Sequence, residues 1–130
     1  STSQISGSGN ADDVTQTFFA AARSDRDATR ESEFLYLDAI MNSDSSTESA
    51  KKTAQEQKLA LVERMEKELA LETLIKGKGF DDVIVTIGDK GVSIVVGSEE
   101  LTVEQANLIL SVVVSETTFK ATEVNVIPYN

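Results

Sequence analysis

The stretch that decides the fold is VIVTIGDKGVSIVV, residues 83–96. β-Branched residues occupy every second position before the Gly88-Asp89-Lys90-Gly91 segment and again after it. Alternation with a period of two is typical of a strand with one buried face, and a short segment bounded by glycines can turn the chain back. The stretch therefore predicts a β-hairpin, one face of which carries Val83, Val85, Ile87, Val92, Ile94 and Val96.

A helix is predicted immediately before the hairpin, from about Ser45 to about Lys76. Ser45 and Glu48 have the spacing of a capping box, in which side chains satisfy free backbone N–H groups of the first turn. Gly77 and Gly79 follow the last regular position, where glycine commonly ends a helix. The strongly apolar positions lie only in the second half of this helix: Leu59, Val62, Met65, Leu69, Leu71, Leu74 and Ile75.

A second helix and a third strand are predicted after the hairpin. Thr102 and Gln105 form another capping box, which places the helix at about 103–116. A last strand is expected over Ala121–Ile127, ending before Pro128, because proline cannot donate to a strand ladder. The order helix, strand, strand, helix, strand (αββαβ) predicts an α+β domain, with a three-stranded sheet and two helices on one face.

The sequence before this domain is predicted to form two further segments. Its first residues are mostly Ser, Gly, Thr, Gln and Asn, a composition that buries too little apolar surface to fold. The next residues suit a helix, with Arg23 and Asp27 as an opposite-charge pair in its solvated middle. The predicted organisation is a flexible tether (1–11), an N-terminal helical extension (12–44) and the αββαβ domain (45–130).

The helix before the hairpin is longer than the sheet that it would cover. Strands of about seven residues span roughly 23 Å, which supports about 15–17 residues of helix. Residues 59–75 satisfy that length, so residues 48–57 are expected to project beyond the sheet. The late face of the N-terminal extension is the expected docking partner for this projection. The resulting helical hairpin would use Phe34, Leu37 and Met41.

One sheet face has no predicted element to cover it, and it would carry Ile84, Thr86, Ser93, Val95, Glu123, Asn125 and Ile127. In the helix after the hairpin, the stripe Val103, Ala106 and Leu110 is expected to face the core. A half-apolar surface is either a protein interface or the ordinary scatter of apolar side chains on a small domain. On the first interpretation, the partner-interface residues are Ile84, Thr86, Ser93, Val95 and Ile127 of the sheet, Phe34, Leu37 and Met41 of the extension, and Leu108, Ile109 and Val112, which would be exposed in a monomer.

The composition lacks the residue types on which most enzyme mechanisms depend. The chain contains no His, Cys or Trp, so the commonest general base and the thiol nucleophile are absent. Adjacent acids occur, but the ligand spacing of an EF-hand does not. No catalytic residue, cofactor or metal is therefore predicted. A small acid-dependent enzyme would require Asp81, Asp82 and Glu123 to converge.

The charge of the chain narrows its partners. The formal net charge of −10 disfavours non-specific binding to nucleic acid and to anionic lipid. The element order is also similar to that of a KH nucleic-acid-binding module, which is kept as an alternative, although the acidic balance provides no basic groove. No apolar run reaches the roughly 18 residues of a membrane span, so an anchor is expected only outside this sequence.

Three features together resemble the stage III sporulation protein AH family. These are the hairpin at 83–92, the capped helix from Thr102 and the ending ATEVNVIPYN at 121–130. The similarity extends from about Phe34 onward and depends on the overall string and the element order. It implies a ring-building motif, the small αββαβ domain shared with the ring-forming YscJ/FliF proteins of type III secretion and the flagellar basal body.

The resemblance also implies a location and partners. Family members are anchored in the mother cell membrane by one N-terminal helix, with this domain in the intermembrane space facing the forespore. The implied partner is the ectodomain of stage II sporulation protein Q (SpoIIQ), with other copies or other proteins of the sporulation AA–AH operon completing a ring. We therefore expect a non-enzymatic assembly domain of a channel, or feeding-tube complex, that links the two membranes.

Overall fold

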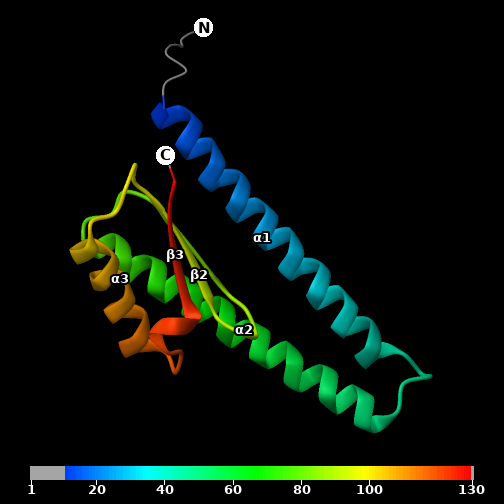
Figure 1. The fold of residues 1–130 in the computed structure, drawn as a ribbon. Helices are drawn as coiled ribbons and strands as arrows, with labels where there is room; N and C mark the ends of the chain where they lie inside the picture. Colours follow the sequence, from blue (N-terminus) through cyan, green and yellow to red (C-terminus); the bar gives the residue numbers. More distant parts are fainter. Residues whose placement is uncertain (1–10, 130) are drawn as a thin grey trace, which may run out of the picture.

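Figure 1 shows the protein as a computed structural model, in which residues 11–129 are described. The elements follow one another in the predicted order, which confirms the α+β class. Almost all of the predicted tether lies outside the described residues. The elements are α1 (Ala11–Asn42), α2 (Glu48–Gly77), β1 (Val83–Ile87), β2 (Val92–Gly97), α3 (Val103–Glu116), a 3₁₀ helix (Ala121–Glu123) and β3 (Val124–Tyr129).

The strands form one sheet in the order β1-β2-β3. β1 and β2 are antiparallel, and the Gly88 N–H donates to the Gly91 carbonyl across their turn at 2.8 Å. β3 pairs with β2 in parallel, because α3 carries the chain back to the starting end of β2. The hairpin predicted from residues 83–96 is therefore confirmed.

The core lies between one sheet face and the helices α2 and α3, as predicted. Successive side chains of a strand point to opposite faces, so every second residue of β1 and β2 enters the core. Leu71 and Ile75 of α2, with Ile109 and Val113 of α3, are fully buried against them. The strand residues of this core are those predicted: Val83, Val85, Ile87, Val92, Ile94 and Val96.

The two predicted capping boxes have different outcomes. α2 is capped by Thr47, whose hydroxyl accepts a backbone N–H of the first turn at 3.0 Å, so the box predicted at Ser45 is wrong. Ser45 instead bonds to Ser43 within the turn between α1 and α2, which leaves the cap to Thr47. The box formed by Thr102 and Gln105 is confirmed.

The last strand begins and ends later than predicted, and it includes Pro128. The Ser98 N–H donates to the Tyr129 carbonyl at 3.0 Å, so the backbone groups of Tyr129 point toward β2. Backbone direction alternates along a strand, so the nitrogen of Pro128 points away from β2. Proline therefore interrupts no hydrogen bond here.

α1 does not join α2 and α3 on the core face of the sheet. Its first half crosses one end of the opposite face, where Phe19 is fully buried. A Cβ at Gly97 would lie 3.4 Å from the Phe19 ring, so the missing side chain leaves room for this ring. The Phe18 ring stacks on Tyr129 with 3.8 Å between centroids. The prediction that nothing covers this face is therefore wrong at the Gly97 end.

α1 and α2 form an antiparallel pair that extends beyond the sheet (Figure 1). Leu37 and Ala54 are buried in this pair. Asp38 binds Lys58 at 2.7 Å, and the Lys58 ammonium lies 5.9 Å from the Phe34 ring centroid. The predicted helical hairpin is thereby confirmed, and its projecting part, residues 31–60, is called the arm below.

Candidate interaction surfaces

One edge of the sheet is closed by arginine side chains of α1. The backbone groups of Val83, Val85 and Ile87 in β1 point away from β2 and would be free at an ordinary sheet edge. Each of these carbonyls instead accepts a hydrogen bond from one arginine. Arg23 donates to the Val83 carbonyl at 3.1 Å, Arg26 to that of Val85 at 2.6 Å and Arg30 to that of Ile87 at 3.5 Å.

Acidic side chains complete this edge. Glu72 and Glu68 of α2 each accept a β1 N–H, at 2.8 and 2.7 Å. The same carboxylates pair with arginines of α1, Glu72 with Arg26 at 2.6 Å and Glu68 with Arg30 at 2.8 Å. A third pair joins α1 to the residue before β1. We call these six side chains the β1 clamp: Arg23, Arg26, Arg30, Glu68, Glu72 and Asp82.

Half of the β1 clamp is withdrawn from water. Arg30, Glu68 and Glu72 are 6%, 2% and 7% exposed. Burial raises the pKa of Glu68 above its usual range, and the Ile87 N–H, Arg30 and Arg26 partly offset that effect. A charge at this depth requires its partner, so the pairs hold α1 and α2 in register on β1.

The clamp contradicts the prediction that the middle of α1 is solvated and that Arg23 pairs with Asp27. Arg30 is buried, and Arg23 binds Asp82. The missed signal is the spacing of the arginines, which repeats every three or four residues and continues into the apolar stripe of the arm. Residues so spaced share one helix face. The positions are 23, 26, 30, 34, 37 and 41.

The sheet face opposite the core is covered unevenly. α1 lies beside β1, and Ile84 is only 4% exposed, so its predicted exposure is wrong. Coverage decreases toward β3, where Ile127 is 39% exposed. Two rows of side chains cross this face from β1 to β3, namely Ile84-Val95-Ile127 and Thr86-Ser93-Asn125. All of them except Asn125 are predicted interface residues; Val95 and Ser93 are half-buried, and Thr86 is exposed.

The predicted orientation of α3 is wrong. Ile109 and Val112 face the core, whereas Val103 is 77% exposed. The capping box fixes where the helix begins but leaves its rotation open. The face containing Ile109 and Val112 buries more apolar area than the predicted stripe, which includes Ala106. Leu108 is 37% exposed, as predicted.

The arm uses its predicted interface residues internally. Leu37 is 6% exposed, and Phe34 and Met41 are half-buried, so these side chains join α1 to α2. Leu59 and Leu69, two of the strongly apolar positions in the second half of α2, lie on the surface at 60% and 65% exposure, and Val62 and Leu74 are also exposed. The sequence pattern did not separate these leucines from Leu71 and Ile75, because apolar residues occur on several sides of α2.

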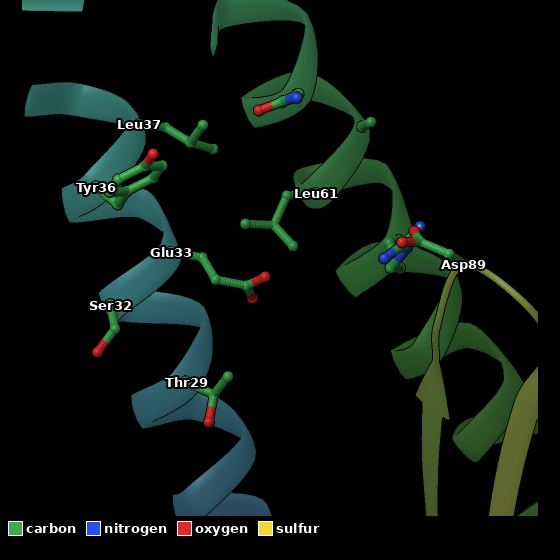
Figure 2. Close-up of a pocket in the computed structure, with 10 residues that line it drawn as sticks. Thr29, Ser32, Glu33, Tyr36, Leu37, Leu61 and Asp89 are labelled. Carbon is green, nitrogen blue, oxygen red and sulfur yellow. Dashed lines mark hydrogen bonds and ion pairs between the residues drawn. The ribbon is translucent and has the colours of Figure 1, made fainter. Parts of the chain in front are cut away.

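A groove of about 610 Å³ lies between the arm helices near the hairpin turn. Figure 2 shows Leu37 and Leu61 pointing toward one another across it, with Glu33 between the helices. Arg64 binds Asp89 at 3.0 Å and ties α2 to the turn. The other lining residues are Thr29, Ser32, Tyr36, Gln57 and Ala60, so the groove presents a mixed polar and apolar surface.

The acids proposed for an enzyme do not converge. Asp82 lies beside Gly97 and Glu123 beside Gly91, at opposite ends of β2 and roughly 20 Å apart. Among the described side chains, those of residues 14–129, no group of three acids could hold a metal ion. In the same part of the chain, no helix combines the length and the apolar character that a bilayer crossing requires.

Comparisons with known proteins identify relatives of this chain. The family described as "SpoIIIAH-like protein" matches residues 2–126. Stage III sporulation protein AH of Bacillus subtilis (strain 168) is 34% identical over 107 residues, 79% of this chain and 49% of that protein, so the chain spans about half the length of this relative. A chain of the solved "Structure of the SpoIIQ-SpoIIIAH pore forming complex" is 31% identical with a TM-score of 0.77, over 85% of this chain and 96% of that one.

Proposed function

This chain is a member of the SpoIIIAH-like protein family, and on that premise we propose that it is a non-enzymatic assembly domain of a sporulation channel. It pairs with a forespore protein of the SpoIIQ type, and the pairs pack side by side into a ring. The ring links the mother cell and forespore membranes. The domain lies in the intermembrane space, and its anchor lies in the mother cell membrane.

One observation carries this proposal, namely the similarity to a chain of the solved SpoIIQ-SpoIIIAH complex. The shared fold covers 96% of that chain at 31% identity, so nearly all of its residues have a structural counterpart here. Identity at this level, with common topology, supports a common mode of assembly.

The accessible side chains support assembly over catalysis. Several large apolar residues lie on the surface of α1, α2 and α3 in a domain that is otherwise strongly acidic, and burial of exposed apolar side chains drives protein association. The most exposed are Leu35, Tyr36, Leu59, Leu69 and Val103, each at least 60% accessible. The net charge of −10 opposes the nucleic-acid alternative.

Gel filtration with light scattering tests the proposal. The chain is mixed with the ectodomain of the SpoIIQ-type partner from the same organism, and a heterocomplex of the summed mass is expected. An unrelated acidic protein of similar size controls for charge-driven co-elution. Elution of two separate monomers at micromolar concentrations would contradict the proposed pairing of this chain with the SpoIIQ-type partner.

A further inference from the structure

We propose that the groove of about 610 Å³ between α1 and α2 binds an arginine side chain and an adjoining apolar side chain from a short segment of another protein. We call this groove the arm groove. The site rests on the shape of the groove, on one carboxylate that points into it and on an exposed tyrosine in its wall. Its occupation does not depend on the pairing with a SpoIIQ-type partner.

The arm groove lies between facing flanks of α1 and α2, next to the hairpin turn. α1 contributes residues from 29–37 to one wall, and α2 contributes residues from 57–64 to the other. Leu37 and Leu61 form the floor, where they point toward one another (Figure 2). At 1.5 Å per residue the walls are roughly 12 Å long, which admits about two turns of a helix or a short loop. The volume lies in the range of pockets that proteins use for small ligands.

One carboxylate in the arm groove lacks a hydrogen bond. Figure 2 shows Glu33 of α1 pointing into the space between the helices. Among the described residues it pairs only with Arg30, at 3.8 Å between Nε and the carboxylate oxygen, which is longer than a hydrogen bond. Arg30 is itself bonded to Glu68 in the β1 clamp. The Glu33 side chain is 49% exposed, so a donor that enters the groove from solvent can reach it.

The charges of the arm groove favour a cationic ligand. Its lining contains two carboxylates, Glu33 and Asp89, and one cation, Arg64. Arg64 binds Asp89 at 3.0 Å, so the charge of Glu33 is not compensated within the groove. A positively charged group therefore complements the groove, whereas an acidic segment would be repelled.

The wall beside Glu33 favours arginine over lysine. Tyr36 lies three residues after Glu33, on the same flank of α1, and is 69% exposed. A guanidinium group is planar, so it can donate two hydrogen bonds to a carboxylate while its face stacks on an aromatic ring. A lysine ammonium has no such face. Ala60 is exposed in the opposite wall, where an apolar neighbour of the arginine would cover it.

The arginine comes from a different protein, because the arginines of this chain are already bound. Each of them pairs with a carboxylate: Arg23 with Asp82, Arg26 with Glu72, Arg30 with Glu68 and Arg64 with Asp89. Three of these pairs belong to the β1 clamp, and the fourth lies in the arm groove itself. Two copies would also bring together net charges of −10 each, and like charges oppose association.

An NMR titration of the isotope-labelled chain tests the site. The probe is N-acetyl-leucyl-arginine amide, and the control is N-acetyl-leucyl-citrulline amide, in which a neutral urea group replaces the guanidinium. The arginine probe should shift the backbone amide signals of Glu33, Tyr36 and Ala60 with a Kd of about 1 mM, and the citrulline probe should bind at least about fivefold more weakly.

Three results of this titration would overturn the inference. They are equal binding of the two probes, shifts confined to other parts of the chain, and no shift at a probe concentration of about 10 mM. Shifts of the same amides when the chain is concentrated without a probe would assign the arm groove to a second copy instead.

A charge-matched pair of substitutions separates the groove from the net charge. Glu33→Gln removes the carboxylate that points into the groove, and Glu31→Gln makes the same change at an exposed position outside its lining. The arginine probe should bind at least about threefold more weakly to the first variant. Its affinity for the second should change by less than about 1.5-fold at physiological salt, because exposed charges are screened. Equal losses would show that the overall charge attracts the probe.

A second pair of substitutions tests the wall formed by α2. Ala60→Gln adds a neutral side chain inside the groove, and Ala70→Gln adds the same side chain at an exposed position of α2 outside its lining. Glutamine is a good helix former, so both variants should fold, which circular dichroism verifies. Affinity for the arginine probe should fall at least about threefold in the first variant and less than about 1.5-fold in the second. Unchanged binding to the Ala60→Gln variant would contradict binding in the arm groove.

Discussion

At the scale of single residues, the fold depends on charges placed where apolar side chains are usual. Arg30 donates both to the Ile87 carbonyl and to Glu68, and Glu68 accepts the Ile87 N–H. An acid and a base together therefore replace the two hydrogen bonds that a neighbouring strand would supply. This replacement is favourable only while both partners are present, because either charge alone would be buried without compensation.

Arg30→Ala should therefore destabilise the domain by about 3–5 kcal/mol, because Glu68 is 2% exposed and would lose its nearest cation. Urea denaturation measures the change in the free energy of unfolding. Arg64→Ala is the matched control, since Arg64 pairs with the 90% exposed Asp89 and should cost no more than about 1 kcal/mol. Equal costs for the two variants would show that the clamp is not a buried pair.

The raised pKa of Glu68 predicts a pH dependence of stability. Between 4.5 and its raised pKa, the folded state holds this proton more tightly than the unfolded state. This group therefore contributes a stability that falls as the pH rises through that window and is constant below it. Arg30, Arg26 and Glu72 face the same carboxyl group.

Glu68→Gln removes this titration, so the stability of the original chain relative to the glutamine variant should decrease as the pH rises from about 4.5. Denaturant unfolding at a series of pH values measures the difference. A difference that is constant with pH, or that increases with pH, would show that burial does not control this carboxyl group.

At the scale of elements, the parallel pair β2 and β3 depends on a close backbone approach. A Cβ at Gly91 would overlap the Glu123 carbonyl oxygen and lie 3.3 Å from its carbon. Because Gly91 has no side chain, the end of the 3₁₀ helix can pack directly against the start of β2, and β3 therefore begins beside β2. Gly88, in the same turn, has no such neighbour, since the nearest atom to its Cβ position lies 3.8 Å away.

Gly91→Ala should accordingly destabilise the domain by about 1–3 kcal/mol, because backbone must shift to admit the methyl group. Gly88→Ala should change stability by less than about 1 kcal/mol. Thermal unfolding of the two variants under identical conditions provides the comparison. If both alanines were tolerated equally, the close approach at Gly91 would not limit the pairing of β2 with β3.

Local signals in the sequence predicted the elements better than their contacts. The alternation at 83–96 and the capping box at Thr102 each contain the physical cause of the structure within a few residues, and both predictions are confirmed. The rotation of α3 and the course of α1 depend on long-range competition for burial, so the exposure of Ile109 and Ile84 was predicted wrongly. The interface role of these and the other candidate residues stays a prediction.

At the scale of the whole molecule, the two edges of the sheet differ. Side chains of α1 and α2 bond to the outer backbone groups of β1, whereas β3 is the strand at the other edge of the sheet and lies beside α3 (Figure 1). A domain with one closed and one open edge cannot extend by repeated edge pairing, which protects it from open-ended aggregation.

Sedimentation velocity of the chain titrated with the SpoIIQ-type ectodomain, at physiological salt, tests the assembly role most directly. If the proposed function is correct, one faster boundary with a 1:1 mass and a Kd of about 1 μM or tighter is expected, as for a specific interface of standard size. Two unchanged boundaries at concentrations of tens of micromolar would contradict the claim that this chain is an assembly domain for that partner.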